Sequence, residues 1–385
     1  MRETNLLIVG AGPFGLALAA QAAHSGVDHL VVGKPMEFWR GNMPKGMYLR
    51  SACDWHFDPL NVHTIEAFLK PQRKSARDVE PLSLDFYLSY AEWFQQQKKI
   101  HPLPVYVRQL DHVARKKEFV ATTERGQAIK AKNVVLAPGF KHFKHVPEDL
   151  RKRLPPGRFQ HTADFVDFTT AHNRRYLIIG GRQSAFEWAA LLLEAGAAAV
   201  HLVHRHPTPA FAVADWSWVN PLVDGMVKNP KWFRSLAEEE KQGIVQRMWG
   251  EGRLKVEPWL EPRLRDERVK LWPQTEVINF LQESSGGLLA ILSNGERVGC
   301  DQVVLATGYK VDIGKLPYLA AGDLVGRLTE RNGFPVLDDH FETSVPGLFV
   351  TSLPATQDFG PFFAFTISVR ASAKLICERI GKRKS

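Results

Sequence analysis

Residues 5–24 read NLLIVGAGPFGLALAAQAAH, and this stretch decides the fold. The apolar run at residues 5–9 predicts a strand, the glycines after it predict a tight turn, and the alanine-rich residues 16–23 predict a helix. Gly26 indicates the end of this helix, and the apolar residues 29–32 predict a second strand. Strand, glycine turn, helix and strand together predict a βαβ unit at the start of an α/β protein.

The same order of elements returns about one domain later. Residues 176–179 read YLII, residues 180–185 read GGRQSA, and a helix pattern and an apolar run then extend to residue 203. A chain of 385 residues is long enough for two cores of ordinary size. The sequence therefore predicts two Rossmann-like dinucleotide-binding domains.

The glycine turns are suited to binding phosphate. A dinucleotide pyrophosphate is negatively charged, and the free N–H groups at the positive end of a helix can bind it. Gly10 allows the tight turn, Gly12 lets the backbone approach the phosphates, and Gly15 lets helix and strand pack closely. Pro13 and Phe14 lie in the same turn, so we expect residues 10–15 to contact FAD.

One expected part of this first site is missing. The carboxylate that binds the ribose hydroxyls usually ends the second strand, where this chain has Gly33 and Lys34. Either the backbone or a later side chain binds the ribose, or FAD does not bind at this unit.

The second turn is expected to bind a pyridine nucleotide. The strand after it ends in LVHRH at residues 202–206, without a carboxylate. Arg205 can instead bind a 2′-phosphate, which favours NADPH, with NADH as the less favoured nucleotide. A solvent-exposed basic loop is the alternative interpretation. The predicted contacts at the turn itself are Gly180, Gly181, Gln183 and Ser184.

The two units predict how the domains are arranged. We expect an FAD-binding domain at residues 1–165 and 310–385, with an NAD(P)H-binding domain at residues 170–305 inserted into it. The tryptophan-rich residues 207–260 predict a helical insertion. This insertion either covers a sheet or contacts the substrate as a lid.

Composition limits the class of partner and the compartment. The chain has 50 Lys plus Arg against 41 Asp plus Glu, and its net charge of +9 favours anionic partners. Because the basic residues are spread along the chain, we expect nucleotides and no nucleic acid. The three cysteines form no CxxC pair, which argues against a redox-active disulfide and favours a cytoplasmic location. Glycine and proline interrupt the apolar residues 6–23, so we expect no signal peptide and no membrane insertion. We also expect no metal site.

The motifs and their order resemble the class B flavoprotein monooxygenases. The resemblance rests on GAGPFG at residues 10–15, GGRQS at residues 180–184 and ATGY at residues 306–309. Residues 157–165, GRFQHTADF, also match the GxxxHxxxF part of a fingerprint that precedes the second turn in that group. The chain is short for most Baeyer–Villiger enzymes, which favours a relative of the N-hydroxylases or of hydroxylases that act on small ring compounds.

This resemblance implies further site residues. The family packs the segment that here contains Trp39, Arg40 and Leu49 against the flavin ring. His161 is implied as a structural or gating residue near the domain junction, with direct catalysis as the alternative. The implied cofactor contacts outside the glycine turns are Trp39, Arg40, Leu49, Thr307, Gly308, Tyr309 and Gly360.

The resemblance also implies a function. It implies an FAD-dependent monooxygenase that uses NADPH and dioxygen to hydroxylate or oxygenate a small organic molecule through a C4a-peroxyflavin. A flavin-dependent NAD(P)H oxidoreductase that inserts no oxygen would use the same two folds. A non-catalytic nucleotide sensor is a third interpretation. The sequence leaves the substrate and the oligomeric state open.

Overall fold

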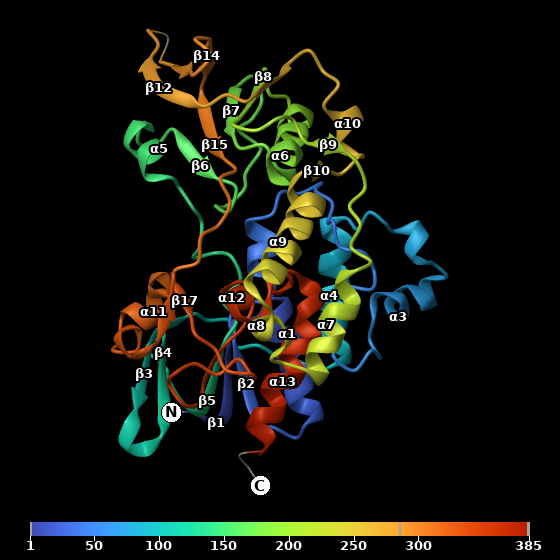
Figure 1. Ribbon diagram of the computed structural model, residues 1–385, viewed down its shortest axis with the longest axis vertical. Coiled ribbons are helices and arrows are strands. Elements are labelled where there is room, and N and C mark those ends of the chain that lie inside the picture. Colours follow the sequence, from blue (N-terminus) through green and yellow to red (C-terminus); the bar gives the residue numbers. More distant parts are fainter. Residues whose placement is uncertain (1, 285, 383–385) are drawn as a thin grey trace.

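The first of the two main sheets is built around the βαβ unit near the N-terminus. The computed structural model describes residues 2–284 and 286–382. This sheet has the strand order β2 (His29–Val32), β1 (Arg2–Val9), β5 (Ala128–Leu136), β4 (Glu118–Thr123) and β3 (Val107–Val113). β18 (Leu348–Val350) pairs in parallel with β5, so the chain returns late to its first sheet, as Figure 1 shows.

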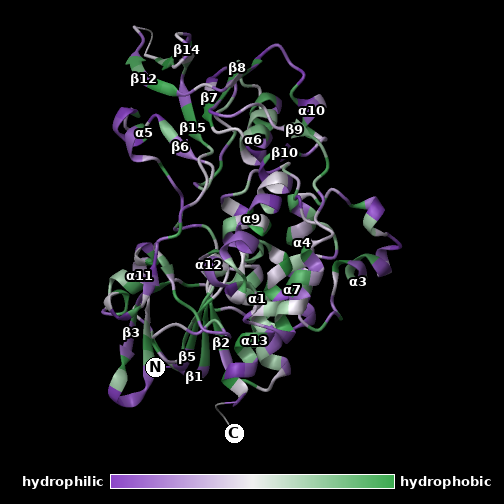
Figure 2. Ribbon diagram, viewed as in Figure 1, coloured by the Kyte–Doolittle hydropathy of each residue, from purple (hydrophilic) through white to green (hydrophobic). Residues whose placement is uncertain are grey.

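The predicted strand, glycine turn, helix and strand are confirmed at the start of the chain. Helix α1 (Pro13–His24) joins β1 to β2, and it contacts both β1 and α13 (Val369–Lys382). Leu6, Leu7 and Ile8 are fully buried, as expected for a parallel strand that is covered on both faces. The second half of β1, residues 6–9, is apolar, whereas Figure 2 shows that the hairpin joining β3 to β4 ends in hydrophilic residues.

The second sheet is parallel throughout and contains the second βαβ unit. Helix α6 (Gln183–Glu194) joins two neighbouring strands of this sheet, which confirms two Rossmann-like domains. The strand order is β11 (Val269–Pro273), β8 (Ala199–His204), β7 (Arg175–Ile179), β15 (Gln302–Leu305) and β6 (Phe159–His161).

The pairing of β6 differs from the expected domain boundary. Val303 of β15 pairs with Phe159, so residues 159–161 belong to the second sheet, although the sequence analysis placed them in the first domain. A strand of three residues gives little sequence signal of its own, and only its partner shows where it belongs. The division into domains remains a prediction, and this pairing favours starting the second domain near Phe159.

The tryptophan-rich insertion packs on helices of the first domain. It contains α7 (Val219–Lys228), α8 (Trp232–Ser235) and α9 (Glu238–Arg253). Helix α7 contacts α13, and α8 contacts α12 (Thr356–Phe359), which Figure 1 shows as neighbouring yellow-green and red helices. Val219, Val223 and Met226 join the same apolar core as the first sheet. The insertion therefore covers helices and not a sheet, because its apolar side chains meet those of α12 and α13.

Two linkers connect the domains and run antiparallel to each other. His145 N donates to Gly308 O at 2.9 Å, and Lys310 N donates to Phe143 O at 2.8 Å. The remaining helices are α2 (Glu37–Gly41), α3 (Ile65–Leu69), α4 (Leu84–Gln97), α5 (Glu148–Arg153), α10 (Leu260–Arg263) and α11 (Pro317–Ala320). The remaining strands are β9 (Ala210–Phe211), β10 (Lys255–Val256), β12 (Val277–Gln282), β13 (Leu288–Leu292), β14 (Arg297–Cys300), β16 (Glu330–Arg331) and β17 (Phe334–Pro335).

A buried ion pair joins the first domain to the last residues of the insertion. Arg50 Nε lies 2.7 Å from Glu257 Oε1, and the two side chains are only 16% and 6% exposed. The Arg50 guanidinium also donates to the backbone carbonyls of Gly252 and Glu251. Removing one member of such a pair leaves an uncompensated buried charge, which is costly.

We expect Arg50→Met to lower the free energy of unfolding by about 3–5 kcal/mol, because Glu257 would stay buried without its partner. The measurement is urea or thermal unfolding of the purified protein. Arg265→Met is the matched control, since Arg265 pairs with Glu261 at the surface with side-chain exposures of 72% and 47%. The Arg265→Met variant should lower the free energy of unfolding by less than about 1 kcal/mol. Equal losses in both variants would contradict a role for the buried pair.

Candidate functional site

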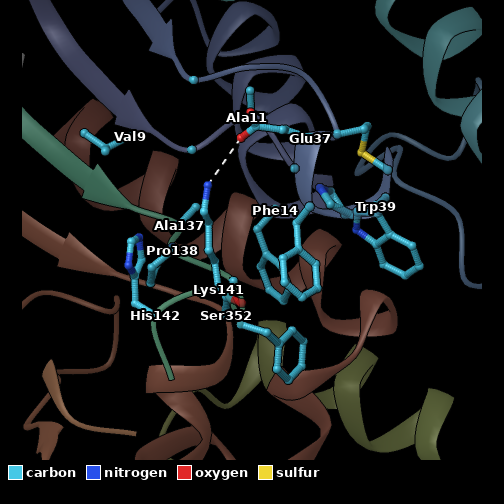
Figure 3. A pocket seen from close by; sticks show the side chains of 18 of the residues that line it. Val9, Ala11, Phe14, Glu37, Trp39, Ala137, Pro138, Lys141, His142 and Ser352 are labelled. Atoms are coloured by element: carbon cyan, nitrogen blue, oxygen red, sulfur yellow. Dashed lines mark hydrogen bonds and ion pairs between the residues drawn. The ribbon is translucent and has the colours of Figure 1, made fainter. Parts of the chain in front are cut away.

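A cavity of about 540 Å³ lies at the carboxyl ends of β1, β2 and β5. Residues 10–14 of the β1–α1 turn and residues 137–142 after β5 form much of its lining. Ligands of open α/β sheets bind at this edge, and the volume is in the usual range for ligand pockets. Figure 3 shows Phe14, Trp39 and Ser352 among the side chains that surround this cavity.

The first glycine turn is closely packed and leaves one position open. A Cβ on Gly15 would lie 1.9 Å from Gly10 O, and one on Gly10 would lie 2.4 Å from Ala137 O. A Cβ on Gly12, in contrast, would meet no atom within 4 Å. Gly12 is the N-cap of α1, and no side chain caps this helix end. The free N–H groups at the start of α1 therefore face the cavity and are available to an anion.

Glu37 is the carboxylate that the sequence analysis did not find. It lines the cavity at the start of α2, and its carboxylate oxygens lie 3.3 Å from Lys34 Nζ and 3.5 Å from Lys141 Nζ. Figure 3 shows the contact with Lys141 as a dashed line. A sequence signal exists, because Glu37 is the only carboxylate among residues 29–53. A carboxylate that comes later than the end of β2 thus lines the cavity.

The residues expected near a flavin ring divide into two groups. Trp39 lines the cavity, and its ring lies 4.9 Å from that of Tyr87. Arg40 lies outside the lining, and its guanidinium pairs with Glu92 at 2.6 Å. Leu49 is buried in the core, with 5% of its surface exposed, and Gly360 is the C-cap of α12. Neither residue lines the cavity. Phe38 and Met43, from the segment expected against the flavin, also line the cavity, and lining residues that were not predicted include Met36, Tyr106, Phe140, His142, Tyr318, Ala364 and Thr366.

The start of α6 reaches the same cavity through Ser184, whereas the predicted residues Gly180, Gly181 and Gln183 lie outside the lining. Ser184 lines this cavity together with residues 10–14. A Cβ on Gly180 would lie 2.5 Å from Ala306 O, and one on Gly181 would lie 2.5 Å from His204 Cβ. The two helix N-termini therefore border one space, as two nucleotides that exchange electrons require.

Gln183 has partners within the protein. Its side-chain nitrogen donates to Glu187 at 3.1 Å, and its oxygen accepts from Glu257 N at 3.0 Å. Glu187 is 4% exposed, and burial raises the pKa of its carboxyl group. Arg205 is exposed just after β8, where the sequence analysis expected a 2′-phosphate.

The ATGY residues lie in the linker that leads out of the second sheet. The Thr307 hydroxyl donates to His145 O, and Gly308 O accepts from His145 N. Tyr309 is the member of this motif that lines the cavity, and its ring lies 4.8 Å from that of Phe140.

His161 lies at the domain junction and outside the cavity lining. It is 1% exposed at the end of β6, and its Nδ1 accepts from Ala163 N at 3.0 Å. Burial lowers its pKa from 6.5 to about 4. The ring is therefore neutral at physiological pH, and this position favours the structural or gating role over direct catalysis.

The cysteines lie away from the cavity, and the described residues form no cluster suited to a metal ion. Burial raises the pKa of Cys53, Cys300 and Cys377 to about 12, and all three lie outside the cavity lining. Among residues 2–284 and 286–382, no group of three His, Cys, Asp or Glu side chains is arranged to hold a metal ion. No helix within these ranges combines the length and apolar character needed to cross a membrane.

Family comparison agrees with this architecture. A model described as pyridine nucleotide-disulphide oxidoreductase matches residues 7–246, which is more than half of the chain. The chain belongs to this family. A second family model with the same description matches residues 247–351 of the chain. Comparison with curated proteins finds no match.

Solved structures share the fold over the whole chain. An ornithine N-hydroxylase from Kutzneria sp. 744 has 15% identity and a TM-score of 0.82, with 100% of both chains covered. L-lysine 6-monooxygenase from Pseudomonas syringae has 20% identity and a TM-score of 0.74, with 98% of this chain and 99% of that chain covered. A bacillithiol disulfide reductase from Staphylococcus aureus has 16% identity and a TM-score of 0.68, with 100% of both covered.

We expect His161 to make stability depend on pH. Because its pKa is lower in the folded protein than in the unfolded chain, the unfolded state takes up the proton first, and stability falls as pH drops from about 7 towards 4. His161→Asn keeps an acceptor for Ala163 N but cannot titrate. Urea unfolding at about pH 7.5 and about pH 5 should show that the parent protein loses about 2 kcal/mol more than the variant. The same pH dependence in both proteins would refute this assignment.

Proposed function

We propose that this protein is a flavoprotein monooxygenase that binds FAD at the β1–α1 turn and NADPH at the β7–α6 turn. The observation that supports it best is the shared cavity, which Gly12 of α1 and Ser184 of α6 both line. A protein that binds a single nucleotide does not require two helix N-termini at the same cavity. The substrate is a small organic molecule, and an amine is the first choice because several proteins of this fold are named as amine-oxidising hydroxylases.

The residues present fit FAD. The α1 N-terminus can bind the pyrophosphate, and the open space at Gly12 lets the phosphates approach the backbone. Glu37 can accept hydrogen bonds from the ribose hydroxyls. Phe14, Phe38 and Trp39 offer an apolar surface to the ring system, and they would exclude water from it.

The chemistry of the reaction comes from the bound cofactors, and the protein supplies positions and surroundings. When bound, FAD would accept a hydride from NADPH and react with dioxygen, which supplies the oxygen inserted into the substrate. The protein orients the two nucleotides by their phosphates and keeps the space between them dry. This agrees with the cavity lining, in which no hydrogen bond among the described residues joins the hydroxyl of Ser184, Ser352 or Thr366 to a histidine that could activate it.

A second candidate function is NAD(P)H oxidation without oxygen insertion. It is favoured by the fold that this chain shares with a bacillithiol disulfide reductase. The buried cysteines disfavour a thiol-based form of this reaction, because a thiol with a raised pKa is a poor nucleophile. Unpaired cysteines also support a cytoplasmic location for either function.

The two glycines of the first turn should respond differently to substitution. Gly15→Ala forces a methyl group against Gly10 O, so we expect it to lower the free energy of unfolding by at least about 2 kcal/mol. Gly12→Ala should cost about 1 kcal/mol or less, since its methyl group meets only open space. It should nevertheless weaken FAD binding by about tenfold or more, because the methyl group occupies the approach of the phosphates. Unfolding curves and FAD titration measure the two effects, and unchanged FAD affinity in Gly12→Ala would count against this site.

The proposed reaction predicts a defined use of oxygen. Purified protein loaded with FAD should be reduced by NADPH without air, and it should consume dioxygen when air returns. With a panel of amines, mass spectrometry should find one oxygen atom from labelled dioxygen in the product. NADPH oxidation that proceeds equally well with a non-oxygen acceptor, without labelled product, would favour the second candidate. Protein that binds neither FAD nor NADPH would refute both.

A further inference from the structure

Three arginines from three separate segments meet beside the second glycine turn. Arg182 is the N-cap of α6, Arg205 follows β8, and Arg253 is the last residue of α9 in the insertion. The Arg182 guanidinium donates to Arg253 O, so the end of α9 lies directly against the start of α6. Of these three arginines, Arg205 is the one that the sequence predicts as a ligand of a 2′-phosphate.

The charges of these arginines lack carboxylate partners among the described residues. In the part of the chain that the structure describes, none of the three forms an ion pair with a carboxylate. The nearby carboxylates have other partners, since Glu251 lies 2.6 Å from Lys255 Nζ and Glu257 lies 2.7 Å from Arg50 Nε.

Electrostatic repulsion at Arg182 supports the same conclusion. Partial burial lowers the pKa of Arg182, and the charges of Arg253 and Arg205 lower it further. A bound anion would relieve this repulsion, and arginine binds phosphate well because its planar group offers several donors.

Trp249 adds a flat apolar surface to the cluster. Its side chain is 45% exposed, which is high for tryptophan in a folded protein. The guanidinium carbons of Arg182 and Arg253 lie 5.1 Å and 5.3 Å from its ring centroid. Leu254, the next residue after the helix, is 53% exposed. An exposed aromatic ring flanked by cations is suited to a planar ligand that carries negative charge.

The position relative to the glycine turn identifies the ligand. In a Rossmann domain the pyrophosphate lies at the helix N-terminus, and the ribose next to the adenine lies beyond the end of the second strand. Here the second strand is β8, and the residue that follows it is Arg205. A phosphate on the 2′-hydroxyl of this ribose would therefore reach the arginines, with the adenine within reach of Trp249.

We propose that Arg205 and Arg253 bind the 2′-phosphate of NADPH and that Trp249 stacks on its adenine. The insertion thus supplies one wall of the nucleotide site and sets the preference for NADPH over NADH. This inference rests on the proposed function for its ligand.

The test uses fragments of the nucleotide, so that it does not depend on catalysis. FAD-loaded protein is titrated with adenosine 2′,5′-bisphosphate and with AMP by calorimetry, while tryptophan fluorescence is recorded. The bisphosphate should bind about tenfold or more tightly than AMP and should quench the fluorescence. Arg253→Gln should lose about tenfold in affinity for the bisphosphate and little for AMP. Trp249→Leu should weaken both ligands by a similar factor and abolish most of the quenching.

Arg247→Gln is the matched control in the same helix. Arg247 packs over Trp218 and pairs with Asp215 at 3.6 Å, away from the arginine cluster. This variant should bind both fragments as the parent protein does, and thermal unfolding of each variant checks that it is folded. Unchanged bisphosphate affinity in both Arg253→Gln and Trp249→Leu would overturn the inference and leave the proposed monooxygenase reaction untouched. If the variants lose affinity as expected but NADPH never reduces the flavin, the site stands and the proposed reaction fails.

Discussion

Backbone contact at the two glycine turns is the constraint on which the rest of the structure depends. A Cβ on Gly15 would lie 1.9 Å from Gly10 O, and one on Gly180 would lie 2.5 Å from Ala306 O. These distances leave no space for a side chain, so only glycine allows strand, turn and helix to pack in this way. The close packing places the N-termini of α1 and α6 at strand ends, where their free N–H groups attract phosphate.

The connections between the domains bring these two helix ends to one space. The antiparallel linkers are joined by the hydrogen bond from His145 N to Gly308 O, and the Arg50–Glu257 pair adds a contact on the side of the insertion. As a result, Ser184 lines the cavity formed mainly by the first domain. Electron transfer between two nucleotides needs this proximity, which neither βαβ unit could provide alone.

The insertion packs into the core of the first domain and also contributes to the proposed nucleotide site of the second domain. Met248 of α9 is buried in the apolar core of the first domain, while Trp249 and Arg253 reach the second glycine turn. The same helix thus takes part in the stability of the first domain and in the proposed preference for NADPH. The apolar cavity, the neutral His161 and the buried thiols all agree with a protein whose cofactors supply the reactive groups.

The sequence by itself determined both βαβ units and the glycines that build their turns, because a strand, a tight turn and a helix depend on residues that are neighbours in the chain. Only the tertiary structure decided which side chains face the cavity. Glu37 lines the cavity, whereas Arg40, three residues later, pairs with Glu92. Gln183 forms its hydrogen bonds with Glu187 and Glu257. The partners of these side chains come from distant segments, and so their roles depend on how the domains and the insertion pack together.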